Sequence, residues 1–294
     1  IVSKPLTTNQ GFTNFIPTKK IDVRYLAYAL KWFTPEIEKL GNSTTFKEVS
    51  RSAMKNFSIP VPSLPIQHLI ADTLHKADVL LEKDQEILTK YDELAQSIFY
   101  DMFGDPVRNE KGWEVRALGE CCDVGSSIRV FVDELTDNGV PFYRGQEIGA
   151  MSSGEEISPT LFITHKHYEK LKANGGVPKS GDLLMPSICP DGRIYQVTDN
   201  KPFYFKDGRV LWIKVNPKHY SSTFLQFLLK EVFARSYWNI ASGTTFAELK
   251  IFALKNLCLP APPGPLQRKF SELKNNIYHQ RNSIRHSSKK GVDL

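Results

Sequence analysis

The sequence is poor in cysteine and has no long apolar run. Four cysteines in 294 residues are too few for a disulfide framework, and the adjacent Cys121 and Cys122 lack the spacing of metal ligands. We therefore expect ordinary buried thiols. No window approaches the roughly 18 apolar residues of a membrane span, and the N-terminus has no signal-peptide pattern. These absences predict a cytoplasmic protein without a membrane segment.

Motifs that bind cofactors or metals are also missing. Between residues 105 and 264 no Gly-rich loop opens a helix after a strand, which argues against an S-adenosylmethionine or ATP site. The Asn-Pro-Pro-Tyr type of segment found in amino-methyltransferases does not occur either. His165 and His167, two residues apart in a predicted strand, have no nearby cysteine or carboxylate to complete a metal site. We expect neither cofactor nor metal.

One catalytic alternative stays open. Pro190-Asp191 followed by Asp199-Asn200-Lys201 imitates a nuclease pattern in which two carboxylates hold Mg²⁺ beside a lysine. Asp199-Asn200 fits a turn equally well. A metal-dependent nuclease using Asp191 and Asp199 is therefore an alternative, and the other is a coiled-coil adaptor that binds protein only.

Composition predicts a folded chain with a mild basic excess. The sequence is 41% hydrophobic and 24% charged, and its length allows about two domains. Thirty-eight Lys and Arg against 32 Asp and Glu leave a net charge of +6. This excess favours acidic partners such as nucleic acid without identifying one.

An internal repeat organises the chain. Residues 44–67 match residues 244–267 at eleven of 24 positions, including the Thr-Thr-Phe segment, three prolines and Gln67/Gln267. Both copies contain a helix, a polar turn, a Pro-rich boundary and a new helix. Only 64 residues precede the first long helix, against 160 before the second. We therefore expect roughly 96 residues (160 − 64) of the first copy to be absent, consistent with a chain that starts at Ile1.

The segments after the two Pro-rich boundaries predict long helices with a coiled-coil seam. Between residues 65 and 104, apolar residues follow a seven-residue spacing, interrupted by Asp84. The helix from Gln67 to Phe103 would be about 55 Å long. Three further residues widen the apolar stripe and are candidates for partner docking: Leu80, Ile87 and Leu94. A solvated helix face explains the pattern equally well.

Charge makes the two helical segments complementary. Residues 65–104 hold eight acids and three bases, a net charge of −5, whereas residues 265–294 hold two acids and seven bases, a net charge of +5. Two helices with seams and opposite charge are natural partners for each other. The second helix is expected to be short or truncated.

Residues 105–264 predict a mixed unit. Short apolar runs beginning near residues 113, 139, 181, 192 and 208 are typical of strands and alternate with helical segments. We predict an α+β fold, in which mixed domains are separated by long helices.

The run from Gln96 to Val107, QSIFYDMFGDPV, together with the repeated Thr-Thr-Phe segments and Gln67/Gln267, resembles the specificity subunit of type I restriction-modification systems. The resemblance covers nearly the whole chain. It implies a non-catalytic subunit with target-recognition domains on spacer helices that pair as an antiparallel coiled coil. The implied map is 1–64, the C-terminal part of the first recognition domain; 65–104, the first spacer helix; 105–264, the second recognition domain; and 265–294, the second spacer helix.

The resemblance also implies partners. A specificity subunit binds a bipartite duplex DNA target and directs adenine-specific methyltransferase subunits and a restriction/translocase subunit to it, since those subunits carry the chemistry. A chain that acts as a half-subunit would form a homodimer.

Candidate DNA contacts lie in basic loops. Cationic side chains contact phosphates, Arg pairs with guanine, and Asn or Gln pairs with adenine. Solvated loop ends are an equally good explanation for the basic loops, and helix capping is the better explanation for the threonines. The candidates are Ser127, Arg129, Arg144, Gln146, Arg193, Lys206, Arg209, Thr244 and Thr245.

Overall fold

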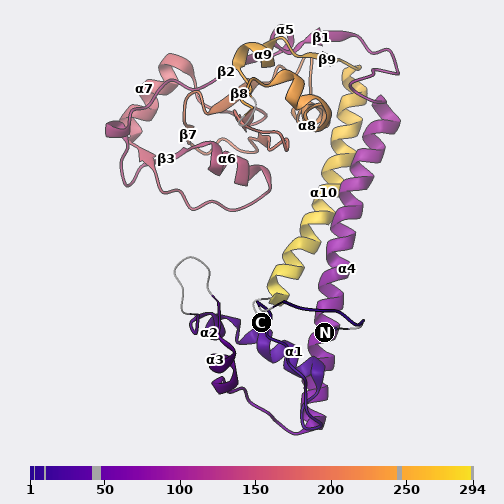
Figure 1. The fold of residues 1–294 in the computed structure, drawn as a ribbon. Coiled ribbons are helices and arrows are strands. Elements are labelled where there is room, and N and C mark those ends of the chain that lie inside the picture. The colour runs from indigo at the N-terminus through magenta and orange to yellow at the C-terminus, as the bar shows by residue number, and fades with distance from the viewer. Residues whose placement is uncertain (3, 10, 42–47, 244–246, 293–294) are drawn as a thin grey trace. The chain divides into compact units, whose positions relative to one another are not determined.

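The computed structural model describes residues 1–2, 4–9, 11–41, 48–243 and 247–292. The chain divides into two compact units. Unit 1 comprises residues 1–89 and 283–294, and unit 2 comprises residues 90–282. Figure 1 shows the order of the elements in each unit. No helix among the described residues is long and apolar enough to cross a membrane.

The regular elements of unit 1, among its described residues, are helices joined by coil, and the described residues before Val23 form no helix or strand. Helix α1 (Val23–Trp32) begins at Asp22, whose side chain accepts hydrogen bonds from the Arg24 and Tyr25 amides. This is a favourable N-cap, because the first amides of a helix lack partners within the helix. The small core consists of Tyr25, Ala29 and Ala71. The other helices are α2 (Thr34–Glu38), α3 (Arg51–Asn56), and the first part of α4 (Leu64–Phe103).

Gln67 ties α4 to the start of α1. Its side chain is fully buried, and its Oε1 accepts a hydrogen bond from the Asp22 amide at 2.8 Å. Its Nε2 donates to the Lys20 carbonyl at 3.1 Å and to the Pro62 carbonyl at 2.7 Å. The Pro-rich boundary is therefore held against α1 by one glutamine.

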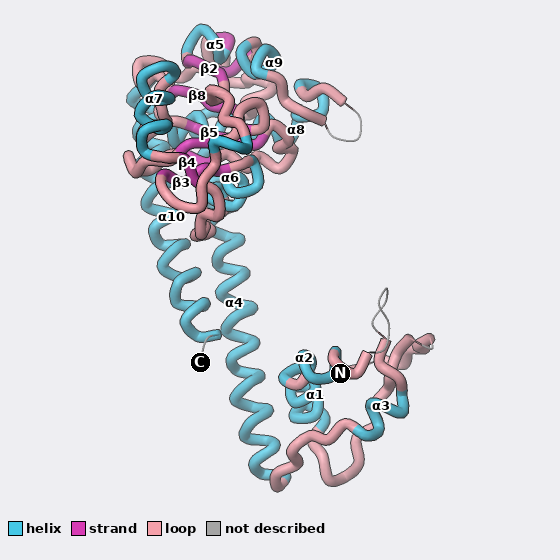
Figure 2. Tube along the Cα trace, turned by 90° about the vertical axis from the view of Figure 1, so that its left-hand side faces the viewer, coloured by secondary structure: helices cyan, strands magenta, loops and turns pink. Residues whose placement is uncertain are grey.

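Unit 2 contains the sheets, which appear as magenta segments among helices in Figure 2. One sheet has the order β2-β8-β5-β6, a second has the order β4-β3-β7, and β1 pairs with β9. The strands are β1 (Val115–Ala117), β2 (Asp123–Gly125), β3 (Val140–Tyr143), β4 (Phe162–Ile163), β5 (Leu183–Pro186), β6 (Tyr195–Gln196), β7 (Tyr204–Phe205), β8 (Val210–Lys214) and β9 (Cys258–Pro260). The helices are α5 (Leu118–Cys121), α6 (Gly145–Ser152), α7 (His165–Gly175), α8 (Ser222–Ile240), α9 (Ile251–Lys255) and α10 (Gly264–Val292), the last reaching into unit 1.

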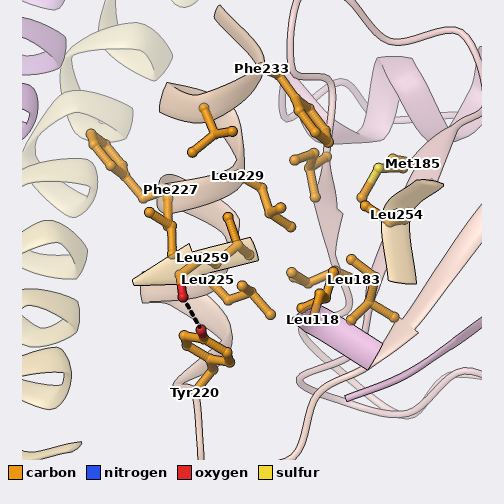
Figure 3. Close-up of a cluster of buried hydrophobic side chains, with 14 of the residues drawn as sticks. Leu118, Leu183, Met185, Tyr220, Leu225, Phe227, Leu229, Phe233, Leu254 and Leu259 are labelled. Carbon is orange, nitrogen blue, oxygen red and sulfur yellow. Dashed lines mark hydrogen bonds between the residues drawn. The ribbon is translucent and has the colours of Figure 1, made fainter. Parts of the chain in front are cut away.

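The core of unit 2 lies between α8 and the four-stranded sheet. Leu225 and Leu229 of α8 are fully buried, as are Leu183 and Met185 of β5. Figure 3 shows side chains of α5, α8, α9 and β5 meeting in this layer, with Leu254 beside Met185. Burial of such side chains contributes about 1.5–3 kcal/mol each. Of the strands that flank the basic loops, β2 and β8 belong to this sheet, whereas β3 and β7 belong to the three-stranded sheet.

The two long helices run antiparallel within unit 2. Phe99 and Phe103 of α4 contact Phe270 of α10, with ring centroids 5.4 and 5.6 Å apart. Further along α10, Arg281 pairs with Asp92 at 3.1 Å. Residue numbers rise along one helix as they fall along the other, which confirms the antiparallel pairing of an acidic helix with a basic one.

Helix α8 is fastened to α4 by a polar network around the buried Glu231. Glu231 is buried, and its Oε2 accepts hydrogen bonds from Gln96 at 2.9 Å and Tyr100 at 2.8 Å. Arg235 donates to the Tyr100 hydroxyl and pairs with Asp105. A buried carboxylate is tolerated because its hydrogen bonds are made. The network joins the sheet-containing part of unit 2 to its helix pair.

Most predicted elements are confirmed. The predicted helix 65–104 is α4, the predicted helix 265–294 corresponds to α10, and a strand lies in each of the five predicted runs. The α+β fold class is confirmed as well.

Two predictions are wrong in detail. His165 and His167 open helix α7 instead of lying in a strand, because the Thr164 side chain caps the helix by accepting from the His167 amide. Cys258 is exposed, since it lies on the short two-stranded sheet, whereas the other three cysteines are buried. Along the predicted seam of α4, Ala95 is buried, whereas Leu74 and Leu81 are exposed.

Candidate nucleic-acid interface

The turn between β7 and β8, residues 206–209, is the centre of the candidate interface. The Lys206 amide donates to the Tyr143 carbonyl at 2.9 Å, which places the turn beside the end of β3. A Cβ on Gly145 would lie 3.2 Å from the Arg209 carbonyl oxygen, so glycine allows the start of α6 to approach the turn. Arg144 and Gln146 therefore lie next to Lys206 and Arg209.

A third segment joins the turn from the other side. The Ser126 hydroxyl donates to the Val210 carbonyl and accepts from the Gly208 amide. The Ser127 hydroxyl donates to the Phe205 carbonyl at 2.7 Å, and Arg129 pairs with Asp207 at 2.9 Å. The structure thus brings together six of the predicted contacts: Ser127, Arg129, Arg144, Gln146, Lys206 and Arg209.

The cations of this cluster lie outside the acids that hold them. The side chains of Arg129, Arg144 and Arg209 are 66%, 52% and 68% exposed, whereas those of their partners Asp207, Glu147 and Glu248 are 13%, 18% and 23% exposed. A phosphate or a base edge that approaches this surface meets guanidinium groups first. Such an arrangement suits contact with nucleic acid.

Two of these acids, Glu248 and Glu147, are held in the charged form. Hydrogen bonding by Lys250 is the main reason why the pKa of Glu248 lies below its usual value, and Arg209 adds to the effect. For Glu147, burial opposes ionisation, but hydrogen bonds from the Arg144 guanidinium and from backbone amides bring its pKa below the usual value. Charged acids keep the cations in place at neutral pH.

The remaining candidates lie apart or outside the described residues. Arg193 pairs with Asp191 at 2.7 Å and lies against α6, since a Cβ on Gly149 would be 3.0 Å from its Nη1. Thr244 and Thr245 fall outside the described residues. Ser127 is half-buried and uses its hydroxyl within the protein, so the structure gives it an anchoring role. Its contact with DNA stays a prediction.

Sequence reasoning missed four members of the cluster. Asp207, Glu147 and Glu248 are the acids that organise it, and Lys250, 58% exposed, pairs with Glu248. Glu48 and Glu248 are identical in the two copies of the repeat, a signal that pointed to the glutamate. Nothing in the sequence pairs Arg129 with Asp207, which follows it by 78 residues.

The nuclease alternative finds no support in the described residues. Asp191 pairs with Arg193, and Asp199 pairs with Lys201 at 3.6 Å. Among the described positions no group of three or more His, Cys, Asp or Glu residues is arranged to hold a metal ion.

The candidate docking residues are exposed on α4. Leu80 and Ile87 belong to unit 1 and are 63% and 39% exposed, and Leu94 belongs to unit 2 and is 47% exposed. Their seven-residue spacing places them along one side of the helix. They form an apolar stripe of the kind that partner proteins cover.

Unit 2 is a mixed α+β domain with exposed cations on its loops and an antiparallel pair of long helices, an arrangement that fits a DNA-recognition protein. Residues 1–90 match the model of the type I restriction modification DNA specificity domain. The chain is 32% identical to the MjaIX specificity subunit of a type I restriction enzyme from Methanocaldococcus jannaschii, and the match covers 95% of this chain and 68% of that protein. The chain therefore belongs to the specificity subunits of type I restriction enzymes.

Solved structures share the fold. The S subunit of the type I restriction-modification system from M. genitalium matches with a TM-score of 0.58 and 18% identity, over 93% of this chain and 70% of that one. A structure that describes complex assembly and conformational transition of a type I R-M system matches with a TM-score of 0.52 and 18% identity, over 92% of this chain and 66% of that one. The chain thus spans about two thirds of the length of these relatives.

Proposed function

We propose that the chain selects the DNA target of a type I restriction-modification complex and is not itself catalytic. In this proposal residues 105–264 form a complete target-recognition domain, and residues 1–64 form the C-terminal part of a first one. The helices of residues 65–104 and 265–294 are the spacers. The equivalent roles of Gln67 and Gln267, which tie each spacer helix to its preceding helix, support this division.

The observation that carries the proposal is the cluster of exposed cations over half-buried acids at the β7–β8 turn. Arg129, Arg144, Lys206 and Arg209 come from three separate loops and meet on one surface. Clustering of cations on one face is typical of surfaces that bind duplex DNA. A second recognition domain, of which residues 1–64 are part, would read the other half of a bipartite target.

The proposed protein partners are adenine-specific methyltransferase subunits and a restriction/translocase subunit, which would carry the methylation and cleavage chemistry. The exposed residues Leu80, Ile87 and Leu94 on α4 are the proposed docking surface for a methyltransferase subunit. A chain that acts as a half-subunit would assemble as a homodimer.

Mapping of methylated adenines tests the function. Cells that carry the full chain together with its methyltransferase subunit should methylate a bipartite motif, with a fixed gap between two short half-sites. Absence of any motif, or a single continuous one, would contradict the proposal. The purified complex should also bind a duplex that contains the motif, with an affinity that falls as salt rises. A protein-only adaptor would show no such binding.

Co-purification tests the docking surface. Leu80→Asp and Ile87→Asp should reduce recovery of the methyltransferase subunit with the chain, because a charge cannot be buried in an apolar interface without a partner. Leu69→Asp is the matched control, since Leu69 is 68% exposed on the same helix. Equal recovery with all three variants would refute the docking assignment.

A further inference from the structure

Arg129 is held in a way that leaves one end of its guanidinium group available. Its Nε donates to Asp207 Oδ2 at 2.9 Å. Among the described residues, neither Nη1 nor Nη2 of Arg129 has a hydrogen-bond or ion-pair partner in the protein. The side chain is 66% exposed. The Nη1 and Nη2 end of the group is therefore open to a ligand.

Asp207 is a fixed support for this arginine. Its side chain is only 13% exposed, and its Oδ1 lies 3.7 Å from Lys206 Nζ. The Arg209 amide donates to the Asp207 carbonyl, and the Gly208 amide donates to Ser126. The carboxylate thus stands on a turn whose backbone is tied at both following residues.

The loop that carries Arg129 is equally well anchored. The Ser126 and Ser127 hydroxyls donate to backbone carbonyls of Val210 and Phe205, and the Ile128 amide donates to the buried Tyr204 hydroxyl at 3.0 Å. The backbone on one side of Arg129 and the carboxylate that grips its Nε are therefore both set by the fold. A pre-set side chain loses little freedom on binding.

The other arginines of the cluster are held differently. Arg144 uses both Nε and Nη2 on Glu147, and Arg209 approaches Glu248 through Nη1. Arg193 is also held through Nε, but its partner Asp191 is 55% exposed and is a less fixed support. Arg129 alone among these four combines a free Nη end with a largely buried acid.

Guanine is the base that matches this geometry. Its major-groove edge offers two acceptors, N7 and O6, which an arginine binds through two parallel N–H groups. We propose that Arg129 reads a guanine in the half-site bound by unit 2, and that Asp207 is the positioning residue that orients its guanidinium group. The inference rests on the proposed function and names one element of the target.

Methylation mapping with the full chain and its methyltransferase subunit tests the inference. The wild-type motif should contain a guanine in one half-site. Arg129→Ala should lower the preference for guanine at that single position by about tenfold or more, with the other positions unchanged. Asp207→Asn should weaken the preference for guanine at the same position, because a neutral amide holds the guanidinium group less firmly. Arg108→Ala and Asp199→Asn, exposed charges outside the cluster, should leave the motif intact.

Other outcomes overturn the inference. A uniform loss of methylation in Arg129→Ala, without change of the motif, would indicate a phosphate contact or a folding defect. Arg129→Lys distinguishes guanine reading from a phosphate contact, because lysine keeps the charge and loses the bidentate geometry of arginine. This variant should weaken the preference for guanine at the same single position, and an unchanged motif would refute guanine reading. Absence of any wild-type bipartite motif would instead refute the proposed function.

Discussion

Gln67 and Gln267, separated by 200 residues, make the same three hydrogen bonds. Each accepts from the amide of the residue that caps a helix, Asp22 or Ser221, and donates to two carbonyls, one of them in the Pro-rich boundary. Both are buried, at 0% and 1% exposure. The sequence repeat is therefore a repeat of structure, in which one side chain joins each long helix, α4 or α10, to the start of an earlier helix, α1 or α8.

The first prediction concerns these glutamines. Gln267→Ala should lower the free energy of unfolding by about 2–4 kcal/mol, because it leaves the Ser221 amide and two buried carbonyls without partners. Gln267→Glu should also destabilise, since a carboxylate cannot donate to the carbonyls of His219 and Pro262. Urea unfolding checks both variants. Gln85→Ala, at an exposed position of α4, should change stability by less than about 0.5 kcal/mol, and an equal loss there would contradict the prediction.

The second prediction compares Leu254 with Met54, its counterpart in the repeat. Leu254 is fully buried, so Leu254→Ala should cost about 2–5 kcal/mol. Met54 is half-buried and lines a cavity of about 540 Å³ together with Leu30 and Val49. Met54→Ala should therefore cost clearly less. Hydrogen exchange that reports on each unit separately measures the two losses, and equal losses would show that Met54 is part of a closed core.

The third prediction is a pH dependence that arises from Lys274. Burial is the main reason why its pKa falls to about 8, from 10.5, and Lys230 adds to the effect. Between these pH values the unfolded chain binds the proton more tightly, so the contribution of Lys274 to stability rises with pH. At pH 7 the buried charge costs about 3 kcal/mol, offset in part by the hydrogen bond to Gln226.

Replacement of this lysine measures that cost. Lys274→Met should be more stable than the wild type at pH 7, and the advantage should shrink as the pH rises toward 10. The difference between the two proteins is the quantity to follow, because other groups titrate equally in both. Lys269→Met, at an exposed position of α10, should show no such trend. A pH-independent difference for Lys274→Met would mean that its pKa is not lowered.

The fourth prediction rests on the proposed DNA contact of Lys206. Lys206→Ala should weaken binding to the target duplex and reduce the salt dependence of affinity by about one phosphate contact, without a change in the motif. Titrations at several salt concentrations measure the slope. The control Lys201→Ala removes a side chain that is 87% exposed outside the cluster, and it should leave the slope unchanged. Equal slopes for all three proteins would remove Lys206 from the interface.

Local patterns in the sequence were enough to predict the helices and the repeat. The seven-residue apolar spacing defined α4, because side chains at that spacing share one face of a helix, and Pro-rich boundaries marked where each long helix begins. The opposite charges of residues 65–104 and 265–294 predicted the pairing that Asp92 and Arg281 now show. These features depend on neighbours along the chain or on composition, which a sequence displays directly.

The acids of the candidate interface were decided only by the tertiary structure. Arg129 and Asp207 meet because β7 and β8 place the turn of residues 206–209 beside the loop that follows β2, and no local pattern records that approach. The helix that begins at His165 is a different case, because its capping residue Thr164 is a local signal that the strand prediction overlooked. The sequence by itself determined the family, the long helices and the repeat. The fold alone decided which charges meet, because those contacts join residues far apart in the chain.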